Sequence, residues 1–337
     1  MSKYVCGIDI GTTGVKVMIF SLDGTVISSA YTEYACTFPQ SGWVDQERIL
    51  HKLGVDGYYQ DWSNGSLYGL MNIKTFEWDL ELIEALDIER NKLPELVPSG
   101  QALGKVSASA AFLTGFAEGT LLVAGAGDQQ CAGIGAGAIK SGTIEVTMGT
   151  AGVTLGYMDQ PNMDPTMKMP CSAHAIAGKW ESEGLQNAAG AAFKWFRNEF
   201  AFEEQQKADA EGLDVYDVID EEIEKVQPGC NGLIFLPYLA SSAAPNWDAF
   251  ARGTFIGFNL GHGKADMARA ILASLGAGLY ENVQDAVDQM LKRKKVYEPN
   301  LKNTVVYEKY FKAYKEAYQA LSQAGIYEKL VKLALNS

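Results

Sequence analysis

Residues 4–24 read YVCGIDIGTTGVKVMIFSLDG, which is an apolar run, a glycine–threonine turn and a second apolar run. This pattern predicts a strand over residues 4–10, a turn at Gly11–Gly14, and two further strands on either side of a turn at residues 22–25. The chain is therefore expected to open with an antiparallel β-meander. A dinucleotide-binding fingerprint is excluded here, because its glycines need a helix directly after the first strand.

Residues 143–157, TIEVTMGTAGVTLGY, repeat this arrangement of strand, glycine turn and strand. The two turns share the pattern G-T-x-G-V, once at Gly11–Val15 and once at Gly149–Val153. Two copies in the same local context indicate a duplicated unit. The alternative is a pair of unrelated hairpins, since turns in general favour Gly and other small polar residues.

Turns of this kind can bind phosphate. A tight glycine turn presents backbone N–H groups to an anion, and the hydroxyls of Thr12 and Thr13 would add donors. Asp9, at the end of the first strand, would hold a metal ion through water, and Lys16 would add a positive charge. The matching turn at Gly149–Gly152 would hold the same chain of phosphates from the other side. The alternative for each turn alone is an ordinary β-turn without a ligand.

Asp128 follows the buried run Leu121–Gly125 and precedes the small-residue stretch CAGIGAGAIK, for which we predict a helix. An aspartate in that place is typical of a helix N-cap. It is equally well placed to act as a general base for a substrate hydroxyl, with Gln129 hydrogen-bonded to a neighbouring hydroxyl. The residues by themselves leave both interpretations open.

The composition of the 337 residues restricts the function further. Lys and Arg total 28 against 41 Asp and Glu, a net charge of −13, which disfavours nucleic acid and anionic membranes as partners. The five cysteines lack a C-x-x-C spacing and only three histidines occur, so neither a disulfide framework nor a zinc site is expected. The sequence also contains no P-loop and no G-x-S-x-G motif.

The start MSKYVCGIDIG lacks the basic and apolar regions of a signal peptide, and no apolar run reaches the roughly 18 residues of a membrane span. We therefore expect a cytoplasmic protein. Helical periodicity predicts helices at residues 76–92, 108–115, 187–200, 264–275, 281–292 and 305–335. The last of these is amphipathic and rich in Tyr and Lys, and would suit a homodimer.

Together, in this order, the segments resemble the FGGY family of carbohydrate kinases, and within it the xylulokinase-like branch. The resemblance is carried by GIDIGTTGVKVMIFSLDG (7–24), SGWVDQE (41–47), VAGAGDQQCAGIGAGAIKSGTIEVTMGT (123–150), WESEGLQNAAGAAFKWFR (180–197) and residues 232–273 and 278–300. It implies an α/β fold of two ribonuclease-H-like domains with a cleft between them, as in actin, hexokinase and the heat-shock chaperone ATPases. It also implies ATP- and Mg²⁺-dependent phosphorylation of a small sugar, with a ketopentose such as xylulose as the first expectation.

The resemblance assigns roles to individual residues. Asp128 matches the catalytic base, and Gln129 a sugar contact beside it. Asp9 matches the strand-end carboxylate near the metal, which it would hold through water. The nucleotide-binding residues expected from the resemblance and from the turns themselves are Gly11, Thr12, Thr13, Lys16, Gly149, Thr150, Gly190 and Lys194.

The chain departs from the family at two points. Near Leu50–His51 the family has core strands that carry sugar contacts, and near Ala273–Gly278 it has a glycine-rich adenine-side motif; no GGG occurs in this chain. The expected domains, 1–125 on the sugar side and 126–337 on the nucleotide side, would each lack a segment at these points. Two explanations stay open: the polypeptide is longer than the printed sequence, or the chain is a remnant with impaired catalysis that serves as a nucleotide-binding or interaction protein.

Overall fold

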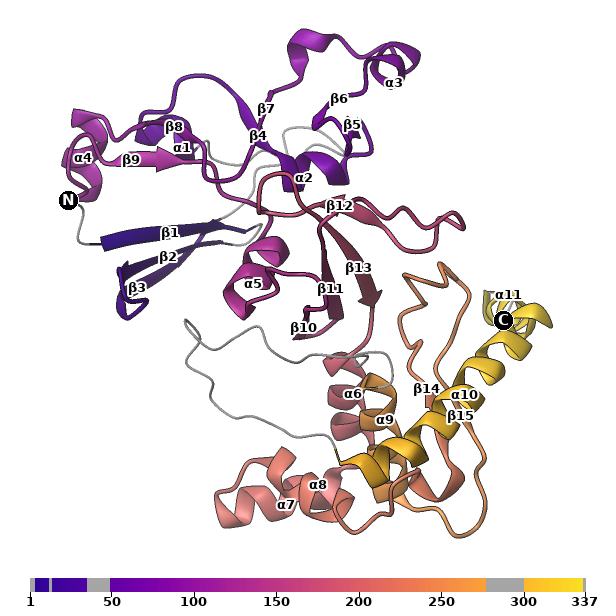
Figure 1. Ribbon diagram of the computed structural model, residues 1–337. Coiled ribbons are helices and arrows are strands. Elements are labelled where there is room, and N and C mark those ends of the chain that lie inside the picture. Colours follow the sequence, from indigo (N-terminus) through magenta and orange to yellow (C-terminus); the bar gives the residue numbers. More distant parts are fainter. Residues whose placement is uncertain (1–3, 12–13, 35–48, 277–299, 336–337) are drawn as a thin grey trace. The chain divides into compact units, whose positions relative to one another are not determined.

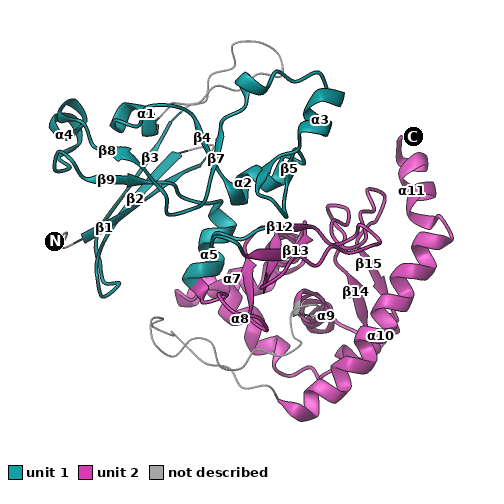
Figure 2. Ribbon diagram, turned by 45° about the horizontal axis from the view of Figure 1, so that its top comes forward, with its two compact units in different colours: residues 1–135, 173–178, 287–291 teal, residues 136–172, 179–286, 292–337 magenta. Residues whose placement is uncertain are grey.

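A computed structural model describes residues 4–11, 14–34, 49–276 and 300–335, which form both helices and strands (Figure 1). The contacts divide the chain into two compact units, coloured separately in Figure 2. Unit 1 holds the described residues up to 135 together with 173–178, and unit 2 holds the others. The domain boundary expected at residues 125 and 126 stays a proposal.

Unit 1 contains short helices and strands. Its strands are β1 (Tyr4–Ile10), β2 (Gly14–Ser21), β3 (Val26–Glu33), β4 (Tyr59–Asp61), β5 (Met71–Asn72), β6 (Glu77–Trp78), β7 (Glu95–Val97), β8 (Ala102–Lys105) and β9 (Leu121–Val123). Its helices are α1 (Ile49–Leu53), α2 (Trp62–Leu67), α3 (Leu80–Ala85), the 3₁₀ helix η1 (Arg90–Lys92), α4 (Ala108–Thr114) and α5 (Asp128–Ala136). The helix expected at 108–115 is thereby confirmed.

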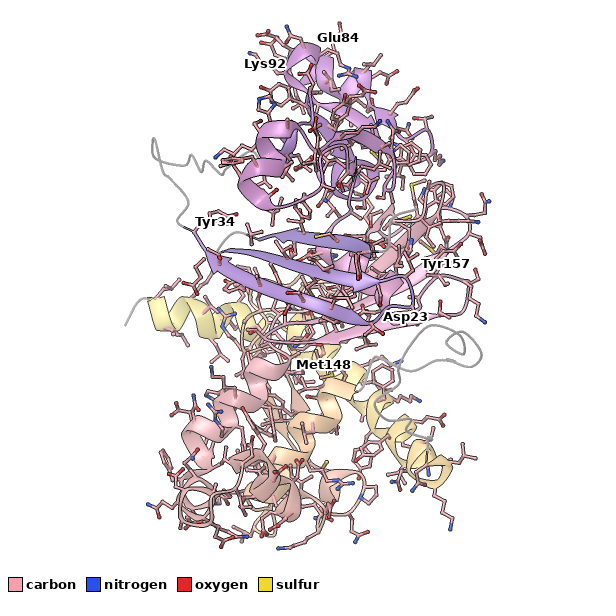
Figure 3. The ribbon with its side chains drawn as sticks, turned by 90° about the vertical axis from the view of Figure 1, so that its left-hand side faces the viewer. Asp23, Tyr34, Glu84, Lys92, Met148 and Tyr157 are labelled. Carbon is pink, nitrogen blue, oxygen red and sulfur yellow. The ribbon has the colours of Figure 1, made fainter. Side chains whose placement is uncertain are left out.

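The predicted meander is confirmed as the antiparallel sheet β1-β2-β3. The turn between β2 and β3 is closed by Asp23, whose carboxylate accepts hydrogen bonds from the Ser21 hydroxyl at 2.5 Å and the Thr25 amide at 3.0 Å. These bonds lower the pKa of Asp23 to about 2. Figure 3 labels Asp23 at this turn and Tyr34 at the opposite end of the sheet.

The meander exposes apolar side chains. Val26 and Ile27 are neighbours in β3 and therefore point to opposite faces of the sheet, yet they are 51% and 53% exposed. Tyr4 and Val5 repeat this in β1, each 52% exposed. Both faces of the sheet therefore present apolar groups to solvent.

The helix expected over residues 76–92 is wrong for most of its length. Glu77 and Trp78 form a strand, and only Leu80–Ala85 is α-helical. Asp79 begins this short helix by accepting the amide of Leu82 at 3.2 Å, and Asp87 follows it with a positive φ of 54°. The apolar spacing was helical, but these two local features restrict the helix to less than two turns.

Unit 2 combines a four-stranded sheet with two groups of helices. Its strands are β10 (Ile144–Met148), β11 (Gly152–Met158), β12 (Cys171–Ala173), β13 (Trp180–Gln186), β14 (Ile234–Leu236) and β15 (Thr254–Ile256). Its helices are α6 (Gly190–Phe200), α7 (Phe202–Glu211), α8 (Val215–Ile223), the 3₁₀ helix η2 (Cys230–Gly232), α9 (Lys264–Gly276), α10 (Leu301–Gln323) and α11 (Ile326–Leu335). The first four strands pair in the order β10-β11-β13-β12, which confirms the predicted second hairpin.

The C-terminal segment forms two helices where one was expected over residues 305–335. Asn300 caps the first by accepting the amides of Lys302 and Asn303, and Gly325, with a φ of 66°, separates the two. The helix expected at 281–292 lies outside the described residues. None of the described helices is long and apolar enough to cross a membrane.

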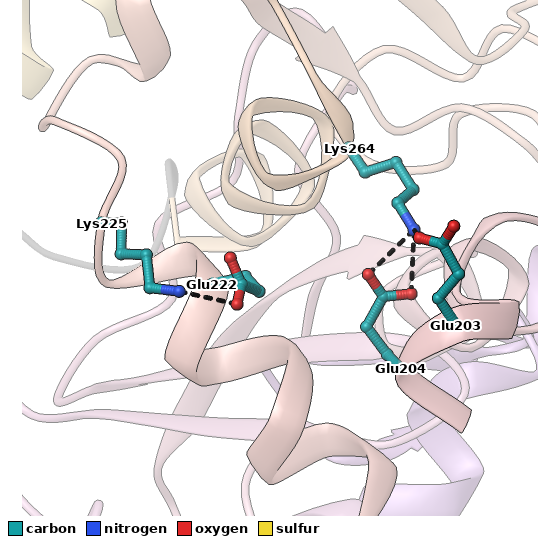
Figure 4. Close-up of polar contacts among 5 residues, drawn as sticks. All are labelled: Glu203, Glu204, Glu222, Lys225 and Lys264. Atoms are coloured by element: carbon teal, nitrogen blue, oxygen red, sulfur yellow. Dashed lines mark hydrogen bonds and ion pairs between the residues drawn. The ribbon is translucent and has the colours of Figure 1, made fainter. Parts of the chain in front are cut away.

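Helices α6, α8 and α9 surround the core of unit 2, in which Phe196, Phe235 and Ile271 are each at most 2% exposed. Lys264 ties the start of α9 to α7, since its ammonium contacts Glu203 at 2.8 Å and Glu204 at 2.9 Å (Figure 4). Because Glu203 remains exposed, this ion pair orients the helices more than it stabilises them.

The β10–β11 turn packs directly against the start of α6. The amide of Gly190 donates to the carbonyl of Gly149 at 2.9 Å, and the amides of Ala189 and Ala191 donate to the carbonyl of Thr150 at 3.0 and 3.2 Å. A Cβ on Gly190 would lie 2.4 Å from the Gly149 oxygen. Glycine is therefore required at residue 190 to let two backbones approach.

We predict that Gly190→Ala destabilises unit 2 by about 1–3 kcal/mol, because the colliding atom is backbone and cannot rotate away. The matched control is Gly156→Ala in β11, where the nearest atom to the added Cβ would be 3.8 Å away. Chemical denaturation followed by circular dichroism measures both variants. Equal stability of the two variants would contradict the close approach.

Candidate active site

Asp128 is exposed at the first turn of α5. The first helical hydrogen bond runs from the amide of Cys131 to the carbonyl of Gly127 at 2.9 Å, so Gly127 occupies the cap position and Asp128 is the first helical residue. One carboxylate oxygen of Asp128 accepts the amide of Gln129 at 2.8 Å. The N-cap interpretation of Asp128 is therefore wrong, because its carboxylate lies in the first turn and not on the cap.

Three carboxylates act on one thiol beside Asp128. Burial raises the pKa of Cys131, and the negative charges of Asp61, Asp128 and Asp9 raise it further. A shared site for Asp9 and Asp128, which are far apart in sequence, stays a prediction. Asp61 was not among the predicted site residues.

The first glycine turn begins at Gly11, two residues after Asp9. The amide of Gly11 donates to the carbonyl of Gly14 at 3.0 Å, and Tyr34 donates a hydrogen bond to the carbonyl of Gly11. Asp9 pairs with Lys16 in the β1–β2 register, so their side chains share one face of the sheet. Lys16 is thus a cross-strand neighbour of Asp9.

Two residues predicted for the first turn, Thr12 and Thr13, lie outside the described residues. Their expected phosphate contacts therefore stay predictions.

The second set of predicted nucleotide residues forms one local group in unit 2. Gly149 and Thr150 lie in the β10–β11 turn, Gly190 starts α6, and Lys194 follows one turn later with an exposed side chain. The amides of Gly149 and Gly190 donate within this group. Those two amides are thus occupied, and a phosphate here would depend on the hydroxyl of Thr150 and the ammonium of Lys194.

The sequence analysis did not predict a hydrogen-bond network that holds the loop before Asp128. Asp61 caps α2 by accepting the amide of Asn64 at 3.0 Å, and it also accepts the hydroxyl of Ser63. The Ser63 hydroxyl in turn accepts the amide of Gly127 at 2.9 Å. The pattern D-x-S-N at residues 61–64 could have revealed the helix cap, but not the bond to a residue 64 positions away.

The donors present fit a metal ion held mainly by substrate phosphates. Among the described residues, no three or more His, Cys, Asp or Glu side chains are arranged to hold a metal. Mg²⁺ in phosphoryl-transfer sites needs only one or two carboxylates, because waters and phosphate oxygens complete its shell. The carboxylate of Asp9 therefore suits Mg²⁺ that arrives with a nucleotide.

Comparisons with known proteins identify kinases among the relatives of this chain. The chain is 37% identical over 235 residues to a gluconokinase of Bacillus licheniformis, which covers 70% of this chain and 45% of the relative. It is 30% identical over 215 residues to a xylulose kinase of Bacillus subtilis strain 168, covering 64% of this chain and 41% of the relative. The chain spans about half the length of the curated relatives it matches.

The fold is also that of solved structures. A ligand-bound xylulose kinase from Lactobacillus acidophilus matches with a TM-score of 0.78 and 21% identity, over 98% of this chain and 100% of that one. This likeness confirms the predicted fold class, an α/β protein with two domains of the actin and hexokinase type.

Family models match most of the chain. The model described as "FGGY family of carbohydrate kinases, N-terminal domain" matches residues 4–53 and 48–135, and its C-terminal counterpart matches residues 144–298. The N-terminal match is split near residue 50, at the first point where the sequence departs from the family. On these matches and on the shared fold, the chain belongs to the FGGY family of carbohydrate kinases.

Proposed function

We propose that this chain transfers the γ-phosphoryl group of ATP to a hydroxyl of a small polyhydroxy substrate, with Asp128 as the general base. The observation that carries the proposal is the exposed carboxylate of Asp128 in the first turn of α5. Membership of the FGGY family supports the reaction type.

The role of Asp128 follows from its surroundings. The amide of Gln129 holds one carboxylate oxygen, and the other oxygen would accept the proton that the attacking hydroxyl loses. A positioned base of this kind contributes about 10²–10⁴-fold to a rate. Gln129 would hydrogen-bond a neighbouring hydroxyl of the acceptor, as predicted from the sequence.

Each unit contains a glycine turn whose residues we propose for contact with the nucleotide. Mg²⁺, when bound, neutralises charge on the phosphates, and Asp9 would hold it through water. Gly11 would lie against the phosphates of ATP, and Thr150 and Lys194 would donate to phosphate oxygens. Gly190 would contribute by holding the Gly149–Thr150 turn in place, through the amide-to-carbonyl bonds described above.

Replacing Asp128 with Asn tests the base. The variant keeps the shape of the side chain and loses its ability to take a proton, so turnover is expected to fall by at least about 10²-fold while ATP affinity stays within about twofold. Sugar-dependent ADP release and calorimetric ATP titration measure the two quantities. Glu118→Gln, an exposed carboxylate change in the same unit, is the control. Substantial turnover by Asp128→Asn would sink the assignment.

Gluconate is our first proposed acceptor, ahead of the xylulose expected from the sequence. It rests on the higher identity of the chain to a gluconokinase than to a xylulose kinase. We expect kcat/KM for gluconate to exceed that for xylulose, ribulose and glycerol by at least about tenfold, since single site contacts supply discrimination of this size. A panel of coupled ADP assays decides this, and a preference for xylulose would restore the original expectation.

A second candidate is a nucleotide-binding protein without catalysis. It is favoured by the short span of the chain relative to its relatives and by the apolar side chains exposed on both faces of the meander. ATP binding without sugar-stimulated ADP release would support it. The intact mass of the natural polypeptide separates the two explanations of the departures, because a mass above 36.6 kDa means that the printed sequence lacks segments.

A further inference from the structure

The loop before Asp128 is held by a hydrogen bond to a buried serine of another segment, Ser63. Ser63 in α2 is fully buried, with 0% of its surface exposed, and its hydroxyl accepts the amide of Gly127 at 2.9 Å. Gly127 is the residue directly before Asp128 and is itself buried. A buried backbone amide needs a partner, and here a single side-chain hydroxyl supplies it.

The serine is itself held in one orientation. Its hydroxyl donates to Asp61, so its lone pairs are turned toward Gly127. The carboxylate of Asp61 also accepts the backbone amide of Asn64 at 3.0 Å, the side-chain amide of Asn64 at 2.9 Å and that of Gln60 at 3.2 Å. Four donors thus fix one carboxylate, which fixes the serine.

Gly127 is confined on its other sides as well. Its carbonyl accepts the amide of Cys131 at 2.9 Å. A Cβ added to Gly127 would lie 2.0 Å from the side-chain oxygen of Gln130 and 3.4 Å from that of Asn64. The backbone at residue 127 therefore has little freedom, and the direction in which the chain enters α5 at Asp128 is set by these contacts.

We infer that Ser63, oriented by Asp61, is a positioning residue that holds Asp128 in place for proton transfer through the amide of Gly127. This inference rests on the proposed function of Asp128. Ser63 is buried and acts only on the backbone, so it contributes to the rate through geometry. Displacement of a catalytic group by about 1 Å can cost on the order of 100-fold in rate.

Ser63→Ala tests the inference, with Ser66→Ala as matched control. Ser66 lies one turn later in α2 and makes the same kind of bond, accepting the amide of Ala173 at 3.0 Å. Its hydroxyl donates to the backbone carbonyl of Ser63 at 2.7 Å and not to the loop before Asp128. We expect Ser63→Ala to lower kcat by roughly 10- to 100-fold with the KM for ATP within twofold. Ser66→Ala should leave kcat within twofold, even if it lowers the melting temperature of the protein as much as Ser63→Ala does.

A double-mutant cycle separates positioning from general damage. If Ser63 acts through Asp128, then Ser63→Ala lowers kcat in the wild-type background and produces no further loss in the Asp128→Asn background. An equal loss in both backgrounds, or an equal loss in Ser66→Ala, overturns the inference. An unchanged kcat in Ser63→Ala also overturns it.

The same set of variants distinguishes failure of the inference from failure of the proposed function. If the wild type is active, Asp128→Asn is inactive and Ser63→Ala is fully active, the inference is wrong and the proposed function stands. Turnover retained by Asp128→Asn, or a wild-type chain without acceptor-dependent ADP release, removes the proposed function and the inference together.

Discussion

The hydrogen bond from the amide of Gly127 to the hydroxyl of Ser63 joins two parts of unit 1 that are 64 residues apart. On one side of it stand β4 and α2, and on the other the loop from β9 into α5. Removing this bond would cost more free energy than its net contribution to stability, because a buried amide left without a partner costs about 1–3 kcal/mol. The position of Asp128, and with it the proposed chemistry, depends on this contact.

In unit 2, backbone hydrogen bonds alone hold a loop against the start of a helix. The β10–β11 turn and the start of α6 are joined by amide-to-carbonyl bonds, and Gly190 is the residue that permits their distance. No side chain is needed for this junction, so its precision comes from the absence of a Cβ. Thr150 and Lys194, which we propose as nucleotide contacts, are positioned by secondary structure, while the loop before Asp128 is held by a buried side-chain network.

The burial of apolar side chains differs between the core of unit 2 and the meander of unit 1. The core of unit 2 is contiguous and lined by aromatic and aliphatic side chains, whereas the meander of unit 1 exposes apolar groups on both faces. Exposed apolar surface of this kind is unusual in a protein that stands alone. It lies in the same unit as the first departure from the family near residue 50, where the N-terminal family match is also split.

The meander and the second hairpin were predictable from the sequence, because glycine turns and apolar alternation are local signals. The family was recognised from the resemblance of whole segments, and the family models confirm it. The sequence misjudged the helix at 76–92, where the cap at Asp79 and the positive φ at Asp87 overrode a helical apolar spacing. It also left open whether Asp128 was a cap. Only the tertiary structure decided that Gly127 caps α5 and that Ser63 and Asp61 hold it, since a bond between residues 64 positions apart leaves no periodic trace in either segment.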